Sequence, residues 1–300
     1  MDRKDFVQKI KRAIAERLGG KYQVRIQEVR KNNGIIMEGL MIFSENHNVS
    51  PTIYLNHFWE AYQEGAALKE IAEEIVRIYT EDTPGRNIDM EFFKHYDRVK
   101  ERVCFRLISA EKNKELLREI PHIPFLDLAI SFYYAYQGKD LGGGSILIHN
   151  SHLEMWEISK EELFHCSKDN TPRLFPWECR TMEEVLSEFQ KQREPERVQN
   201  DFYRVPPFEI LSNSARMYGA ACILYPGVLE ELAERARTDL FLIPSSVHEM
   251  ILLPDQGQQR HNMLREMIRE VNAAQAEPEE ILSDKLYYYD YTEKCTKIVS

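Results

Sequence analysis

The chain has 300 residues, of which 43% are hydrophobic and 29% are charged, and its 39 basic and 49 acidic residues give a net charge of -10. This composition is typical of one large or two modest globular domains and excludes an intrinsically disordered chain. A nucleic-acid-binding protein needs a basic surface that neutralises phosphates, so the acidic balance argues against a nucleic-acid partner, while leaving room for a local basic face.

The cysteines and the N-terminal segment predict the compartment. The five cysteines form no CxxC pair, which predicts reduced thiols in a cytoplasm rather than a zinc ribbon or a disulfide framework. The N-terminal Met-Asp-Arg-Lys-Asp-Phe is charged and predicts a helix, not a secretory signal. No apolar run approaches the roughly 20 residues that a membrane helix needs. We therefore expect a soluble cytoplasmic protein with no membrane partner and no cofactor.

Residues 1–82 predict an N-terminal subdomain built from a helix, a hairpin and two more helices. Apolar residues recur at helical spacing from Phe6 to Leu18, and Gly19-Gly20 ends that helix. Asn32-Asn33-Gly34 predicts the turn of a hairpin between strands at 22–29 and 35–43. Two helices follow, the second over residues 68–79. The turn Thr83-Pro84-Gly85 predicts the joint with the rest of the chain.

Residues 83–300 predict a main domain in which hairpins and helices alternate without strict βαβ repeats. The expected elements up to the middle of the chain are a helix near 89–98, a strand at 103–108, a short helix ending at Pro121, a buried strand at 125–136, a turn at Gly142-Gly143-Gly144, a strand at 145–149, and a helix from Ser159 that ends at Asn170-Thr171-Pro172. A capping box at Thr181–Glu184 and a charged loop near 190–200 come next.

The C-terminal third predicts a helix at 228–235, strands at 240–243 and 250–253, a helix at 263–274 and a last strand at 285–289. Together these elements predict an α+β fold with mixed, largely antiparallel sheets and amphipathic helices packed on them, in two subdomains. The aromatic tail of Tyr287, Tyr288, Tyr289 and Tyr291 could form an edge that accepts a strand from a partner protein.

The segment from Asp239 to Pro254 joins the predicted core to possible chemistry. Its two apolar runs flank Ser245, Ser246, His248 and Glu249, and buried polar groups need partners because each unpaired one costs about 1–3 kcal/mol. A hydroxyl, an imidazole and a carboxylate are the groups of a nucleophilic hydrolase. The surrounding residues lack the Gly-x-Ser-x-Gly pattern, so the alternative is that the serines cap a turn and His248 bonds to the backbone.

A second candidate is the pair His149 and His152, three residues apart at the end of a predicted strand. Two imidazoles at this spacing could bind a metal ion if His248 or Glu249 supplied a third ligand. The alternative is a helix-capping turn that contains Asn150 and Ser151, with both histidines partly exposed.

Five segments resemble a family of gut Firmicutes proteins described only as a domain of unknown function, DUF5688. They are Asn48-Val-Ser-Pro-Thr-Ile-Tyr-Leu55, Phe125-Leu-Asp-Leu-Ala-Ile130, Asn170-Thr-Pro-Arg-Leu174, Asp239–Pro254 and Leu282-Ser-Asp-Lys-Leu-Tyr287. The resemblance spans nearly the whole chain. It implies a bacterial cytoplasmic protein with an α+β fold, and it implies no activity, substrate or cofactor.

Three functions follow from these observations. The first is a binding or regulatory module without catalysis, with an unidentified protein as partner, because no motif of strong specificity occurs in 300 residues. The second is a hydrolase whose site joins the cluster from Ser245 to Glu249 to residues near His149 or Asp127, with or without a metal ion. The third, nucleic-acid binding, requires a contiguous basic face and an affinity that falls with salt.

Overall fold

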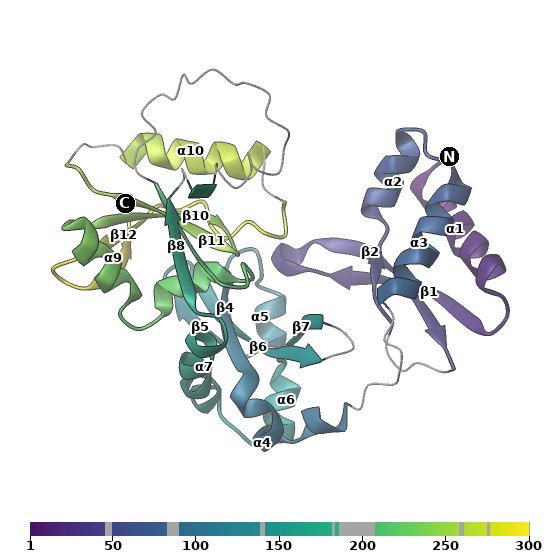
Figure 1. Cartoon of the computed structure of the whole chain (residues 1–300), viewed down its shortest axis with the longest axis horizontal. Coiled ribbons are helices and arrows are strands. Elements are labelled where there is room, and N and C mark those ends of the chain that lie inside the picture. Colours follow the sequence, from purple (N-terminus) through teal and green to yellow (C-terminus); the bar gives the residue numbers. More distant parts are fainter. Residues whose placement is uncertain are drawn as a thin grey trace. The chain divides into compact units, whose positions relative to one another are not determined.

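The structure is a computed structural model that describes residues 1–45, 50–82, 90–138, 142–181, 184–185, 208–257, 261–274 and 277–299 (Figure 1). The chain divides into two compact units. Unit 1 comprises Met1–His95 and Ala135–Ser145, and unit 2 comprises Tyr96–Tyr134 and Ile146–Ser300. The predicted boundary after residue 82 falls on Thr83-Pro84-Gly85, which lie outside the described residues, so that boundary stays a prediction. The predicted loop at 190–200 lies outside them as well.

Unit 1 contains a three-stranded antiparallel sheet in the order β1-β2-β3, and its helices pack on one face of that sheet. Its elements are α1 (Arg3–Leu18), β1 (Tyr22–Arg30), β2 (Ile36–Ser44), β3 (Ile53–Tyr54), α2 (Asn56–Gln63) and α3 (Leu68–Asp82). Phe6 and Ile10 of α1, Leu40 of β2 and Ile75 of α3 are completely buried in one core. The predicted order of helix, hairpin and two helices is confirmed.

Local sequence signals account for the ends of these elements. Asp2 caps α1 by accepting a hydrogen bond from the backbone N–H of Asp5, and Gly19, at φ 76°, ends the helix. Asn33 and Gly34 both have positive φ, 61° and 69°, between β1 and β2. Asparagine and glycine are the residues that adopt this conformation at least cost, which is why this hairpin is readable from sequence.

Unit 2 contains a six-stranded antiparallel sheet in the order β13-β12-β10-β11-β9-β8. Its strands are β8 (Trp177–Thr181), β9 (Glu209–Asn213), β10 (Leu240–Ser246), β11 (Glu249–Pro254), β12 (Tyr287–Asp290) and β13 (Cys295–Ile298). The helices α9 (Val228–Ala236) and α10 (His261–Ala274) belong to the same part of the chain, and Leu264 and Ile268 of α10 pack against Phe241 and Ile243. In this strand order β10 and β11 are the two central strands. β12 pairs with β10 on one side and with β13 on the other, so Tyr287–Tyr289 do not form an edge of the sheet. The edge strand at this end is β13.

A second antiparallel sheet of unit 2 consists of β4 (Val103–Ser109), β6 (Leu128–Gly138) and β5 (His122–Phe125), with β7 (Gly142–Leu147) also paired to β6; residues 135–145 group with unit 1. The short helix α5 (Leu116–Glu119) precedes β5, and α6 (Asn150–Trp156) and α7 (Lys160–Leu174) follow β7. Asp127, in the turn between β5 and β6, accepts hydrogen bonds from the hydroxyls of Ser283 and Tyr287, both at 2.7 Å, and so links the two sheets. The predicted α+β fold with antiparallel sheets is confirmed.

Four local predictions differ from the structure. The helix expected near 89–98 is interrupted, because His95 is extended between a 3-10 helix at Glu91–Lys94 and the single turn α4 (Tyr96–Val99). The strand expected at 125–136 is the hairpin β5–β6, with Leu126 at φ 53° in its turn. The three glycines expected to form a turn lie inside β7. The helix expected to end at Asn170-Thr171-Pro172 continues to Leu174 with Pro172 inside it.

Pro172 is tolerated because tertiary contacts hold the last turn of α7. The side-chain amide of Asn170 donates to the carbonyl oxygens of Lys100 and Val103, at 2.7 and 3.0 Å. The hydroxyl of Thr171 accepts from the backbone N–H of Phe105 in β4 at 3.1 Å. These bonds outweigh the helix bond that proline removes. In the part of the chain that the structure describes, no helix combines the length and the apolar character needed to span a membrane.

Candidate functional site

The cluster predicted from sequence lies at the turn of the β10–β11 hairpin, in the centre of the six-stranded sheet. Pro244 pairs with Met250 and Ser246 pairs with Glu249, so Ser245 is one extra residue on β10, a β-bulge. Val247 is 4% exposed, and the four polar residues around it are half-buried. The segment is therefore held between sheet elements, as the sequence predicts.

The serine hydroxyls are engaged within the turn itself. The hydroxyl of Ser246 accepts a hydrogen bond from the backbone N–H of His248 at 3.0 Å. The hydroxyl of Ser245 donates to Oε1 of Glu249 at 3.2 Å. Ser246 thus contacts the backbone of His248, and its bond serves the turn in the manner of a capping hydroxyl.

The imidazole of His248 is fixed by two partners from outside the hairpin. Its Nδ1 accepts a hydrogen bond from the backbone N–H of Tyr218 at 3.1 Å. Its Nε2 lies 3.5 Å from Oε1 of Glu280. Because Nδ1 accepts, the proton of the neutral ring is on Nε2 and faces that carboxylate. The lone pair that a general base would use is already occupied by a backbone amide.

The backbone of the turn is bonded as completely as its side chains. Val247 donates its N–H to the carbonyl of Glu280 at 2.8 Å and accepts from the N–H of Ala220 at 3.3 Å. The carbonyl of His248 accepts from the hydroxyl of Ser212 at 2.8 Å. Groups from three distant segments therefore hold two residues of the turn, which is how buried polar groups avoid the cost of desolvation.

Tyr218 stacks on His248, and the two rings lie 5.8 Å apart at 13°. On the same tyrosine the guanidinium of Arg106 lies 4.7 Å from the ring centroid, and the buried ring of Tyr133 meets it edge-on at 5.1 Å. The Nε of Arg106 donates to the hydroxyl of Ser131 at 3.3 Å. We call Arg106, Tyr218, His248 and Glu280 the Tyr218 stack.

The backbone next to Tyr218 is unusual and explains its position. Tyr218 has φ 57°, in the left-handed region, which is uncommon for a bulky residue. The side chain of Asn213 organises this loop by bonding to the backbone of Ala215 and Met217. A Cβ atom on Gly219 would lie 2.5 Å from the carbonyl oxygen of His248, so only glycine fits there.

Arg106, Tyr218 and Glu280 are not among the site residues that the sequence predicts. Arg106 gives the only signal, since it is the one charged residue in the otherwise buried strand β4. A buried strand seldom contains an arginine without a specific partner. Nothing in the sequence around Tyr218 or Glu280 indicates that they approach His248, because each lies 30 or more residues away from it.

The two histidines predicted as metal ligands lie at the N-terminus of α6. The N–H of His149, the N-cap residue, donates to Nδ1 of His152 at 3.0 Å, and the rings meet edge-on at 5.6 Å. Burial and the neighbouring His149 lower the pKa of His152. Among the described residues no group of three or more His, Cys, Asp or Glu side chains is placed to hold a metal ion. The structure therefore brings His149 and His152 together but joins them to no third ligand in its described part.

The cysteines are not activated. Burial raises the pKa of Cys104, Cys179 and Cys222 to about 12, so each is a protonated thiol at neutral pH. The thiol of Cys222 donates to the carbonyl oxygen of Ser212 at 3.2 Å, next to the Tyr218 stack. Cys104 and Cys222 thus behave as buried apolar side chains with a weak donor, while the half-buried thiol of Cys179 lies 3.6 Å from the carboxylate of Glu209.

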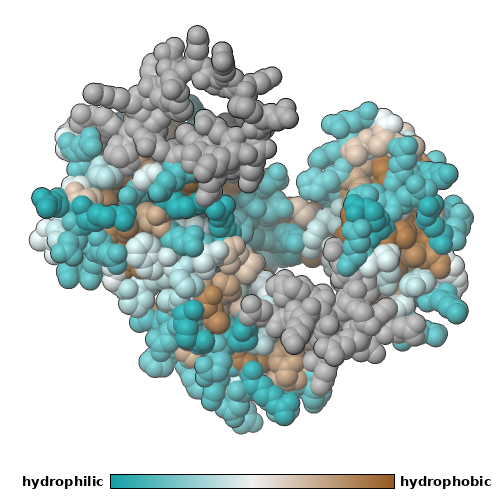
Figure 2. All heavy atoms as spheres, in the orientation of Figure 1, coloured by the Kyte–Doolittle hydropathy of each residue, from teal (hydrophilic) through white to brown (hydrophobic). Residues whose placement is uncertain are grey.

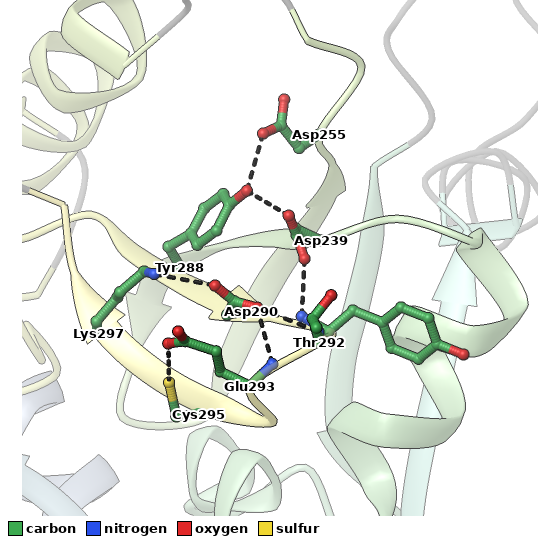
Figure 3. Close-up of polar contacts among 9 residues, drawn as sticks. Asp239, Asp255, Tyr288, Asp290, Thr292, Glu293, Cys295 and Lys297 are labelled. Carbon is green, nitrogen blue, oxygen red and sulfur yellow. Dashed lines mark hydrogen bonds and ion pairs between the residues drawn. The ribbon is translucent and has the colours of Figure 1, made fainter.

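A second polar cluster surrounds β12 and β13 (Figure 3). The hydroxyl of Tyr288 lies 2.7 Å from Oδ2 of Asp239 and 3.1 Å from Oδ2 of Asp255. Burial, followed by these two carboxylates, raises the pKa of Tyr288. Asp290 accepts bonds from the backbone of Glu293 at 3.0 Å and from Lys297 at 3.0 Å. Through Asp239, which directly precedes β10, this cluster links the β12–β13 hairpin to the start of β10.

The sequence model of a family described as "Family of unknown function (DUF5688)" matches residues 3–291, nearly the whole chain. The chain belongs to this family. The match agrees with the resemblance of the five segments quoted above, and the family carries no stated activity. No curated protein and no solved structure matches the chain.

Proposed function

We propose that this DUF5688 protein is a binding or regulatory module that acts without catalysis and has another protein as its partner. The observation that carries the proposal is the bond from the backbone N–H of Tyr218 to Nδ1 of His248. A serine hydrolase needs that imidazole lone pair to remove the proton of the nucleophile. In this chain Ser246 accepts a bond from the backbone of His248, which supports a structural part for both residues.

The surroundings of the turn support the same conclusion. An oxyanion hole needs backbone N–H groups that are free to bind a developing negative charge. The N–H groups of Val247, His248 and Tyr218 are all engaged, with Glu280, Ser246 and His248 respectively. The backbone N–H groups that could stabilise a reacting carbonyl at this turn thus already donate hydrogen bonds that hold the turn.

A fluorophosphonate probe tests the proposal on the full-length protein, because it labels serines whose hydroxyls are activated by a base. We expect no labelling of Ser245 or Ser246 by mass spectrometry. We also expect His248→Ala to lower the melting temperature, since it leaves the N–H of Tyr218 and the carboxylate of Glu280 without their partner. Labelling that His248→Ala abolishes would overturn the proposal.

The second candidate function is a hydrolase that uses the Ser245, His248 and Glu249 side chains, with or without a metal ion. One observation favours it: the hydroxyl of Ser245 donates directly to the carboxylate of Glu249. This function predicts fluorophosphonate labelling that Ser245→Ala removes and Ser246→Ala leaves intact. Elemental analysis of the purified protein tests the metal-assisted form, which requires a stoichiometric metal that His149→Ala reduces.

A further inference from the structure

The β1–β2–β3 sheet of unit 1 has one face that none of the described helices of the unit covers. The alternation of the strands places Val24, Leu40 and Ile42 against the helices. Glu38 lies on that covered side, where Arg3 of α1 pairs with it at 2.7 Å. The residues between them point to the opposite side, which we call the open face. Its strand residues are Gln23, Arg25, Gln27, Val29, Met37, Gly39, Met41, Phe43 and Tyr54.

The β2 and β3 side of the open face is apolar, where an antiparallel sheet with a solvated side is normally polar, while Gln23, Arg25 and Gln27 of β1 make the other side polar. Val29, Met37, Met41, Phe43 and Tyr54 are each half-buried, and none of them packs against the core of unit 1. Figure 2 shows hydrophobic areas among hydrophilic ones on the visible surface of this part of the chain. Contiguous exposed apolar surface marks interaction sites more often than single exposed residues do.

The charge of the open face is positive, and among its described strand residues Arg25 bonds only to a neutral side chain, that of Gln23, at 2.8 Å. Arg25 lies 5.1 Å from the ring centroid of Phe43, and Lys31 lies 3.9 Å from that of Tyr54. None of the strand residues on this face is acidic, in a chain whose net charge is -10. The complementary partner is therefore apolar with acidic residues beside its apolar side chains.

These features favour a peptide over a nucleic acid. Bases bind by stacking on exposed aromatic faces while cations contact the phosphates. Here the two cations lie over the two aromatic rings. The apolar side chains beside them include the flexible methionines Met37 and Met41, which adapt to varied apolar side chains of a partner. Nine-residue strands also give the face a length of about 30 Å, that of a helix of about 20 residues.

We propose that the open face binds an amphipathic, acidic peptide segment of a partner protein. This proposal rests on the proposed function and names the site and the class of partner. The apolar side of the segment would lie on Met37, Met41 and Val29, and its carboxylates would pair with Arg25 and Lys31. Such a segment would complete a second layer on the sheet, opposite the layer that α1 and α3 form.

Panning a phage-displayed library of random 16-residue peptides against the immobilised full-length protein tests this proposal. We expect the enriched peptides to combine leucine, isoleucine or phenylalanine with aspartate and glutamate. The most enriched peptide, labelled with fluorescein, should bind in an anisotropy titration, and Arg25→Glu should weaken its binding at least tenfold. Met41→Gln should weaken it by a smaller factor, because it removes apolar contact and leaves the charge.

Arg12→Glu is the matched control, since Arg12 is an exposed arginine of α1 on the other side of the sheet and has the same charge change. It should alter the affinity less than twofold. An absence of enrichment, enrichment of basic peptides, or equal effects of the two reversals would overturn the proposal. So would binding of fluorescein-labelled oligo-dT20 that Arg25→Glu abolishes, or a dimer that Arg25→Glu dissociates.

The two proposals fail in different ways. Activity-dependent labelling of Ser245 or Ser246 overturns the non-catalytic function whatever the peptides do. A library that yields no acidic peptide, together with an unlabelled hairpin turn, overturns the open face as the site and leaves the non-catalytic function standing.

Discussion

The β1–β2 hairpin of unit 1 and the β10–β11 hairpin of unit 2 have the same antiparallel pairing but differ in how many of their faces are covered. Four successive residues of β10, from Leu240 to Ile243, are all at most 3% exposed, so both faces are buried. In β1 only Val24 is buried, and in β2 the buried residues are Gly39, Leu40 and Ile42. The β10–β11 hairpin has satisfied polar groups at its turn and no free face, whereas the β1–β2 hairpin presents apolar and cationic side chains on the open face. Binding capacity is therefore expected in unit 1, although the sequence draws attention to the serines and the histidine of unit 2.

Truncation of one side chain in each hairpin should give the largest difference between the two hairpins in the free energy of unfolding. Leu242 is completely buried, and Leu242→Ala should lower the free energy of unfolding by about 3 kcal/mol through lost burial and a cavity. Met41 lies on the open face, and Met41→Ala should cost less than about 1 kcal/mol. Urea unfolding of both variants measures the difference. Equal losses would mean that other residues of the chain cover the open face.

Glycine substitutions should give the next largest difference. Gly219→Ala should cost about 2 kcal/mol or more, because the new Cβ would lie 2.5 Å from the carbonyl oxygen of His248 and 2.8 Å from the backbone nitrogen of Asn213. Gly39→Ala on the open face should cost about 1 kcal/mol. Its Cβ would come closest to the methyl groups of Thr52 and Val29, which can shift, and would lie at an ordinary 3.6 Å from the backbone oxygen of Gln27.

Gly144→Ala is the control for both glycine substitutions, since no atom lies within 4 Å of the position its Cβ would occupy. Thermal unfolding of the three variants gives the ranking. If Gly39→Ala cost more than Gly219→Ala, the turn of the β10–β11 hairpin would be less tightly held than its hydrogen bonds indicate.

The sequence predicts hairpins well where the turn itself contains the information. Asn33 and Gly34 adopt positive φ at low cost, so the first hairpin is visible without any tertiary contact. The β5–β6 turn is not, because Leu126 has φ 53° and no propensity predicts leucine there. Its neighbour Asp127 is bonded to Ser283 and Tyr287, more than 150 residues away, and such long-range bonds stabilise a turn that local sequence disfavours.

In the candidate site, too, what local sequence determines is predictable, and what long-range contacts determine is not. Ser245, Ser246, His248 and Glu249 are adjacent in sequence, so their grouping is predictable, and the capping use of the Ser246 hydroxyl is one of the predicted alternatives. What determines the state of His248 is the N–H of Tyr218, from a loop whose positive φ depends on Asn213 and on the close approach at Gly219. No spacing in the sequence encodes that approach.

The smallest expected effect compares two ways of holding a turn, by a charged group and by a neutral one. Asp290 holds the β12–β13 turn, and bonds from the backbone of Glu293, then Lys297, lower the pKa of its carboxyl (Figure 3). A carboxylate whose pKa is lower in the folded than in the unfolded protein stabilises the fold above its unfolded pKa, about 3.9, and this stabilisation disappears as the pH falls through the folded value. Asp290→Asn removes the charge and keeps an acceptor oxygen. The melting temperature of Asp290→Asn should therefore lie below that of the unmodified protein by a constant amount from pH 7 to about pH 5, and the two should converge below about pH 4. Ser246→Ala, which removes a neutral acceptor from the β10–β11 turn, should cost about 1 kcal/mol at every pH in this range. If the stability difference between Ser246→Ala and the unmodified protein instead disappeared in acid, the hairpin turn would depend on an ionised group. Glu249, which is bonded to Ser245, would then be the first residue to test by substitution with glutamine.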